Sequence, residues 1–196
     1  MQVKKVYLLV HPMYILDVTG EKSKLSKEEI TKYLELTEKN IKKWMKIAKK
    51  CKKTPNEIMI IIGTDYLVNG KHPESKTKKR INSFDPRTKN ILLKAKKELK
   101  NRLIYLPADF KGELDKLLEK RGMKINNKTA LEYFGEYGSQ CGEYLANMLK
   151  EKFSLEKIYY RREASIHSSE DLRAEEHLKK RRLRSWLKKV SFKRRF

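Results

Sequence analysis

The sequence predicts a three-layer, doubly wound α/β fold, and three observations support this prediction. Short apolar runs recur along the chain of 196 residues, and stretches with helical periodicity separate them. The second and third runs are almost continuously apolar, as the buried strands of a parallel sheet require. Each of five runs ends in a cluster of polar residues. We therefore expect a mostly parallel sheet of five or more strands, with helices on both faces and a basic helix at the C-terminus.

The strands are the apolar runs themselves. A strand that is buried on both faces of a parallel sheet shows an unbroken apolar stretch, whereas a strand with one exposed face alternates apolar and polar residues. The five strands are expected at residues 4–10, 57–62, 102–106, 129–134 and 156–161.

Helices are expected between the strands, and several have clear end signals. Ser26 and Glu29 form a capping box at the start of the first helix. Asp85 and Pro86 start the second, with Asp85 as the N-cap and Pro86 at the first helical position. Gly122 ends the third as a left-handed cap. The expected helices start at residues 26, 85, 113, 139 and 168.

Two regions are expected in the chain. Residues 1–167 form a Rossmann-like α/β domain, and residues 168–196 form a basic amphipathic helix and tail. The length fits one domain with a substantial core and such an appendage.

The charge balance favours a polyanionic partner. The chain carries 48 Lys+Arg against 25 Asp+Glu, which gives a net charge of +23. Such an excess favours nucleic acid, nucleotides or anionic lipid surfaces. A Lys-rich compositional bias is the alternative, but that bias raises Lys and Glu together.

The two cysteines, Cys51 and Cys141, predict a reducing, cytoplasmic location and no disulfide framework. Their spacing to histidines does not match a zinc site, and we expect no metal and no cofactor. The N-terminal apolar run is too short for a signal peptide, and no stretch approaches the length of a membrane span. The oligomeric state is not predicted.

Polar residues after the strands should gather at the carboxyl edge of the sheet, where open α/β sheets bind ligands. Asp65 and Asp109 are candidate catalytic carboxylates there, able to hold a ribose hydroxyl, a Mg²⁺ ion or a proton in transit. As loop residues they serve equally well as helix caps or turn formers. The expected ligand-binding residues at this edge are Tyr14, Glu136, Tyr137, Gly138 and Ser139.

The most specific local feature is the glycine-rich turn after the fourth strand, residues 135–144, which opens a helix. With Ser139 as the N-cap, Cys141 lies in the first helical turn. Amide donors and the positive end of the helix dipole would stabilise a thiolate there and lower its pKa. Cys141 is thus a candidate nucleophile. The alternative is a small, partly buried thiol that only packs.

The block at residues 129–165 resembles the nucleophile region of isochorismatase-like cysteine hydrolases. The resemblance implies a three-layer α/β fold, hydrolysis of amide or vinyl-ether bonds in small molecules, nicotinamide among them, and a catalytic role for Cys141. That family carries an Asp after the first strand, where this chain has His11-Pro12-Met13-Tyr14. It carries a Lys after a middle strand, where Pro107-Ala108-Asp109-Phe110 stands here, with Lys111 just beyond.

His11 is the candidate base that replaces the missing Asp, because a Cys–His pair is a standard way to activate a thiol. Its alternative role is to cap the first strand through a backbone hydrogen bond. His167, after the fifth strand, is a second candidate base.

The C-terminal segment 178–196 holds ten Lys/Arg and no acidic residue. Its apolar residues share one helical face, so its cationic face can bind phosphates, and arginines suit RNA because they stack on bases. An anionic membrane or no single partner are the alternatives. The expected nucleic-acid contacts are Arg161, Arg162, Lys179, Lys180, Arg181, Arg182, Arg184, Lys188 and Lys189.

Two functions follow from these features. The first is a hydrolase with Cys141 as nucleophile that acts on a small-molecule or nucleotide substrate. The second is a non-catalytic RNA-binding α/β protein. The two are compatible, since the tail can bring an enzyme to an RNA-bound substrate.

Overall fold

The structure is a computed structural model that describes residues 1–12, 25–63, 86–106, 113–136 and 141–166. The chain divides into two compact units, Met1–Ile166 and His167–Phe196, and the described residues all belong to the first. The basic helix and tail expected at 168–196 lie outside the described residues, as do Asp85 and Ser139.

Five parallel strands form one sheet in the order β3-β2-β1-β4-β5. This confirms the predicted parallel α/β fold. The central strands pair in register, so that Val10 at the end of β1 lies between Ile62 of β2 and Gly135 of β4. The strands are β1 (Lys5–Val10), β2 (Glu57–Ile62), β3 (Leu103–Leu106), β4 (Ala130–Gly135) and β5 (Lys157–Tyr160).

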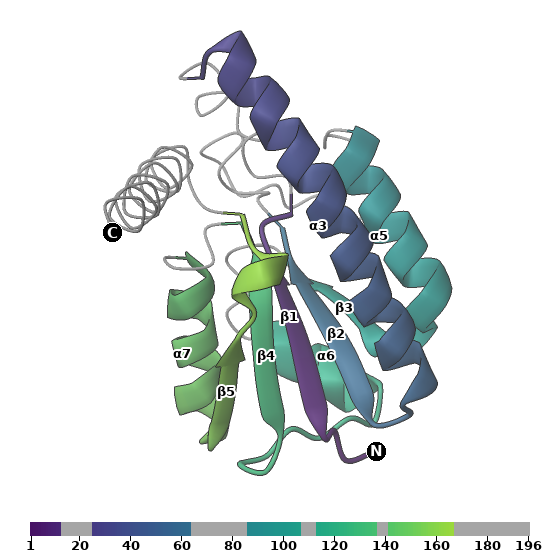
Figure 1. The fold of residues 1–196 in the computed structure, drawn as a ribbon. Helices are drawn as coiled ribbons and strands as arrows, with labels where there is room; N and C mark the ends of the chain where they lie inside the picture. Colours follow the sequence, from purple (N-terminus) through teal and green to yellow (C-terminus); the bar gives the residue numbers. More distant parts are fainter. Residues whose placement is uncertain (13–24, 64–85, 107–112, 137–140, 167–196) are drawn as a thin grey trace, which may run out of the picture. The chain divides into compact units, whose positions relative to one another are not determined.

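Helices cover both faces of the sheet and create two cores. On one face α3 and α5 lie side by side over β1, β2 and β3, and α6 and α7 lie on the other (Figure 1). Alternate residues of each strand enter the two cores: Leu8 packs with α6 and α7, and Leu9 with α3. The helices are α3 (Lys27–Lys53), α5 (Pro86–Leu99), α6 (Glu113–Lys120) and α7 (Glu143–Phe153), with short 3₁₀ turns η1 (Lys100–Arg102) and η3 (Arg162–Ala164).

The long helix α3 is fixed at both ends. At its start the Ser26 hydroxyl accepts from the Glu29 amide at 3.1 Å, and the Glu29 carboxylate accepts from the Ser26 amide at 2.9 Å, which confirms the capping box. At its end the Arg102 guanidinium donates to the carbonyls of Cys51 and Lys52 at 2.6 and 2.7 Å, and also to those of Thr54 and Glu57. The carbonyls of Cys51 and Lys52 belong to the last turn, where the helix leaves carbonyls without the usual amide partner, and those of Thr54 and Glu57 lie in the connection to β2 and at its first residue, so one arginine joins the helix end to the next strand.

The strand order places a topological switch point between β1 and β4. From β1 the chain builds outward through β2 and β3, and β4 and β5 then extend the sheet on the other side. Open α/β sheets bind ligands beyond the carboxyl ends of strands at such a point. Among the described helices, none is long and apolar enough to cross a membrane.

Candidate functional site

The backbones at the switch point approach each other closely at Gly135. Its φ is +125°, and a Cβ at this residue would lie 2.2 Å from the Val10 carbonyl oxygen. The next amide, that of Glu136, donates to the same oxygen at 3.0 Å. A side chain at position 135 would therefore push β1 and β4 apart, and only glycine allows the observed pairing.

Two polar residues follow the two strands at this point and are buried. Glu136 is 1% exposed and accepts a hydrogen bond from the hydroxyl of Tyr33, which lies on α3 and is also fully buried. His11 is 2% exposed, and its backbone amide donates to the Ile62 carbonyl at 2.9 Å. Burial lowers the pKa of His11 to about 4, so its imidazole is neutral at physiological pH.

Cys141 lies in a π-helical turn before α7, whose N-cap is Gly142. Cys141 thus lies in the helical turn that opens this helix, and the predicted N-cap, Ser139, is outside the described residues. Its side chain is partly buried against the core that α6 and α7 build. Burial raises the pKa of the thiol, and a hydrogen bond from its own backbone offsets this only in part. The pKa of Cys141 is thus shifted in the direction opposite to the predicted one, because burial outweighs the backbone hydrogen bond.

The directions of these shifts bear on the expected Cys–His pair. An imidazolium lowers the pKa of a neighbouring cysteine, and a thiolate raises the pKa of a neighbouring histidine. Here the pKa of Cys141 is raised and that of His11 is lowered, and burial is the main cause of both. Both groups are thus held in their neutral forms.

Many of the predicted site residues lie outside the described part of the chain. The structure describes His11, Glu136, Cys141, Arg161 and Arg162. The predicted site residues outside the described ranges are Tyr14, Asp65, Asp109, Tyr137, Gly138, Ser139, Lys179, Lys180, Arg181, Arg182, Arg184, Lys188 and Lys189.

A cationic network occupies the α3 side of the sheet at β4 and β5. The Glu132 carboxylate is buried in β4 and forms ion pairs with Lys5, at 2.5 Å, and with Arg161. Burial alone raises the pKa of Glu132, but the hydrogen bonds and charges of Arg161 and Lys5 outweigh burial and hold it below its usual range. Arg161 also pairs with Glu163 at 3.2 Å. Glu132 therefore stays ionised and fixes the Arg161 side chain, whereas Arg162 is exposed.

Helix α3 holds the segment after β5 through three side chains. The Trp44 indole donates to the Ala164 carbonyl at 2.6 Å, and the Asn40 amide donates to the Ser165 carbonyl at 3.1 Å. The Lys43 ammonium donates to the carbonyl of Glu163. Because three successive carbonyls are bound, the position of α3 is tied to the residues next to Arg161.

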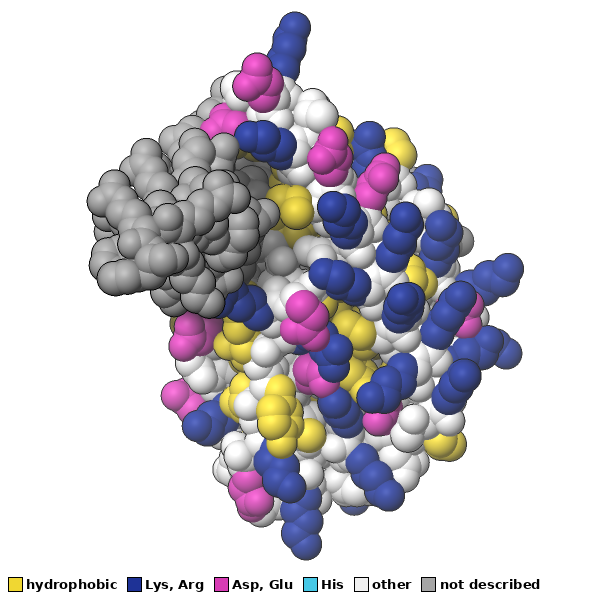
Figure 2. All heavy atoms as spheres, in the orientation of Figure 1, with side chains coloured by type: hydrophobic (Ala, Val, Ile, Leu, Met, Phe, Trp, Pro, Cys, Tyr) yellow, Lys and Arg dark blue, Asp and Glu magenta, His cyan; other side chains and the backbone are white. Residues whose placement is uncertain are grey.

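The second half of α3 carries a dense lysine surface that the sequence analysis did not single out. Eight lysines lie between residues 39 and 53, with no acidic residue among them, and all eight are exposed. Figure 2 shows Lys and Arg side chains gathered over α3 and α5. Four of the lysines follow the spacing i, i+4, i+7, i+11 and so share one face of the helix. We call these the lysine row: Lys39, Lys43, Lys46 and Lys50.

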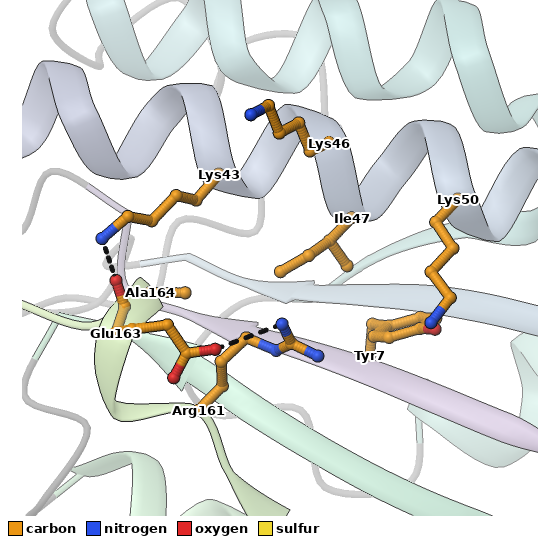
Figure 3. A pocket seen from close by; sticks show the side chains of 8 residues that line it. All are labelled: Tyr7, Lys43, Lys46, Ile47, Lys50, Arg161, Glu163 and Ala164. Atoms are coloured by element: carbon orange, nitrogen blue, oxygen red, sulfur yellow. Dashed lines mark hydrogen bonds and ion pairs between the residues drawn. The ribbon is translucent and has the colours of Figure 1, made fainter.

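Two adjoining hollows lie beside the lysine row. The first has a volume of about 220 Å³ and is lined by Lys43, Lys46 and Lys50 of the helix and by Tyr7 and Arg161 of the sheet side. Figure 3 shows Lys43 and Lys50 extending from α3 toward the strands, on either side of Ile47. The second hollow, of about 300 Å³, is lined by Lys5, Glu132, Tyr159, Tyr160, Arg161 and Glu163.

The arrangement suits an anion better than a metal ion. The two hollows together present five cationic side chains and two carboxylates, and both carboxylates pair with Arg161. Among the described residues, no group of three or more His, Cys, Asp or Glu side chains forms a possible metal site.

Comparisons with protein-family models, with curated proteins and with solved structures found no match for this chain. The resemblance to isochorismatase-like hydrolases stays a prediction.

Proposed function

We propose that the protein binds RNA through the lysine surface of α3, with the basic segment 178–196 as a second contact. One observation carries this proposal. Of the eight lysines between residues 39 and 53, only Lys52 forms an ion pair within the described part of the chain, with Glu98 at 3.0 Å. Lys43 donates to the Glu163 carbonyl, which carries no charge, so the positive charges of the other seven lysines can attract the phosphates of a partner.

The helix that carries the lysines is packed against the sheet and capped at both ends. Helix α3 buries Tyr33, Trp44 and Cys51 against the sheet, and its two ends are capped by side chains. The lysines span about 21 Å along the helix, at 1.5 Å per residue. One strand of a nucleic-acid helix carries a phosphate per about 3.4 Å of axis, and at a similar spacing several phosphates of one strand fit beside this length of helix.

The burial of α3 argues for nucleic acid over a membrane. A basic helix binds a bilayer by inserting its apolar face. The apolar face of α3 is already in the core, with Trp44 at 1% exposure and Ala48 at 0%. RNA is favoured over DNA because the arginines of segment 178–196 suit stacking on exposed bases.

The test is an anisotropy titration of a fluorescein-labelled 20-nucleotide RNA at several salt concentrations. The variant replaces the four residues of the lysine row by Gln. Each phosphate contact in a single strand contributes about 0.7 to the slope of log K against log salt. Loss of four contacts should make that slope shallower by about 3 and weaken binding at low salt.

The matched control removes the same charge elsewhere. Lys116, Lys120, Lys124 and Lys128 are exposed on or after α6, away from α3. Their replacement by Gln should change the slope by less than about 1. Equal effects of the two quadruple variants would show that net charge, and not the α3 surface, determines binding.

The second contact is tested by deleting residues 178–196, which hold ten Lys/Arg. We expect weaker binding and a shallower slope, with the lysine-row variant still reducing the remaining affinity. Unchanged affinity and slope on deletion would remove the segment from the interface.

A further inference from the structure

We infer that the hollows beside the lysine row bind a single-stranded segment of RNA, with a base stacked on Tyr159. This inference rests on the proposed function and names the form of RNA that the surface takes. The phosphates would follow the lysine row, and the base would lie over β5.

The first step is the exposure of an aromatic ring next to the cationic groups. Tyr159 is 52% exposed, although it lies in a strand of the sheet. In the sheet register it is the partner of Glu132, which in turn is the partner of Tyr7. The Tyr159 ring therefore belongs to the same face as Lys5 and Arg161, which pair with Glu132.

The second step is the continuity of the surface. Arg161 and Glu163 line both hollows, so the track runs without interruption from the lysines of α3 to Tyr159. Sites for single strands combine these two features, a cationic groove along the backbone and aromatic rings for the bases. The charge of the track, five cations against two carboxylates, is complementary to phosphate.

The openness of the two hollows argues against an enclosed small-molecule site. Pockets for small ligands have volumes of about 300–1,000 Å³ and bury most of the ligand. The two hollows measure about 220 and about 300 Å³ and are open to solvent. Shallow, connected hollows fit successive units of a polymer that lies along a surface.

A duplex cannot use Tyr159 in this way, because its bases are stacked within the helix and are not free to lie on the ring. The substitution Tyr159→Val removes the ring and keeps a residue that favours strands. Tyr159→Phe keeps the ring. Tyr144→Leu is the matched control, because Tyr144 is 68% exposed on α7.

The experiment measures Kd for a labelled 12-nucleotide oligouridine and for an RNA duplex of the same length. Tyr159→Val should weaken oligouridine binding by at least about fivefold, the lower range for a lost stacking contact. Duplex binding should stay within about twofold. Tyr159→Phe and Tyr144→Leu should bind oligouridine like the unmodified protein.

A second measurement needs no variant. Oligouridine with 4-thiouridine is crosslinked to the intact protein by light, and the tryptic peptides are mapped. We expect an adduct on the peptide 158–161, which contains Tyr159. Adducts found only on other peptides would overturn the inference.

The outcomes separate the two proposals. If Tyr159→Val leaves oligouridine binding unchanged, or weakens the duplex equally, while the lysine-row variant still weakens RNA binding, the stacking inference falls and the proposed function stands. If the lysine-row variant binds both RNAs like the unmodified protein, the proposed function falls, and the inference falls with it.

Discussion

The close approach of the β1 and β4 backbones at Gly135 leads to a stability prediction, the effect of Gly135→Ala. The new Cβ would lie 2.2 Å from the Val10 oxygen, 2.8 Å from the Val10 nitrogen and 3.0 Å from its carbonyl carbon. All three atoms belong to the backbone of the central strand, so a side-chain rotation cannot relieve the contact. The ends of β1 and β4 must move apart by about 1 Å, and overpacking of this kind costs about 1–3 kcal/mol.

Two further costs accompany the movement. The amide of Glu136 donates to the Val10 oxygen at 3.0 Å, and separation of the strands breaks this bond, at about 0.5–1.5 kcal/mol. An alanine at φ +125° adds backbone strain of about 1–3 kcal/mol. Since these costs overlap, we expect a loss of about 3–5 kcal/mol in the free energy of unfolding, a large part of the 5–15 kcal/mol typical of a domain.

The assay is urea unfolding followed by circular dichroism, with Gly122→Ala as the matched control. Gly122 also has a positive φ, +61°, but a Cβ there meets nothing within 4 Å. Its substitution adds strain alone and should cost about 1–2 kcal/mol. If the two variants lose the same stability within about 0.5 kcal/mol, the steric argument for Gly135 is refuted.

Three other predictions test the fixed points of the fold and the thiol. Arg102→Lys should lower the free energy of unfolding by about 1–3 kcal/mol in urea, because an ammonium cannot reach all of the carbonyls that the guanidinium binds; a loss below about 0.5 kcal/mol would contradict this. The pKa of Glu132 is lowered in the folded state, so its contribution is present above the unfolded pKa of about 4.3 and is lost as pH falls through the folded pKa. Glu132→Gln should therefore reduce stability at pH 7 and flatten its decline below pH 4, and parallel stability curves for both proteins would count against the ion-pair network. Iodoacetamide should alkylate Cys141 at pH 7 more slowly than a free cysteine, because burial raises the pKa of its thiol. A faster alkylation rate that is lost in the Cys141→Ser variant would contradict this prediction and support Cys141 as a nucleophile.

The strands were predictable because burial on both faces leaves its mark on the sequence. The run 57–62 is the observed β2 without change, and the other strands differ by one or two residues at their ends. Gly135 belongs to β4 because it pairs with Val10 of β1, and the amide of Glu136 donates to the Val10 carbonyl. Composition alone does not show this pairing. Helix α7 was predicted from residue 139, but its α-helical part begins at Glu143 after a π-helical turn.

The candidate site was less predictable because its contacts join distant parts of the chain. From the sequence alone, Tyr33 is one of several apolar positions on the buried face of a helix. Its hydrogen bond to Glu136 joins two residues that are 103 positions apart. Glu132 stands inside an apolar run, and only the fold brings Lys5 and Arg161 to it. The eight lysines between residues 39 and 53, with no acidic residue among them, are visible in the sequence, but their exposure on a helix that is fixed to the sheet is evident only from the fold.

The lysine surface is costly to the helix that carries it, and this bears on its role. Lysine pairs at i, i+4 destabilise a helix by about 0.2–0.5 kcal/mol each, and the pairs 39/43, 42/46, 46/50 and 49/53 follow this spacing. The helix dipole favours cations only in the last turn, which holds Lys50, Lys52 and Lys53. It gives no benefit to the lysines at 39–46. A general enrichment in charged residues would add glutamates as well, yet none follows Glu38 in this helix. The buried face and the caps of α3 offset this repulsion in the free protein. A bound phosphate backbone would remove it, so the same charges that weaken the helix alone would strengthen the proposed complex with RNA.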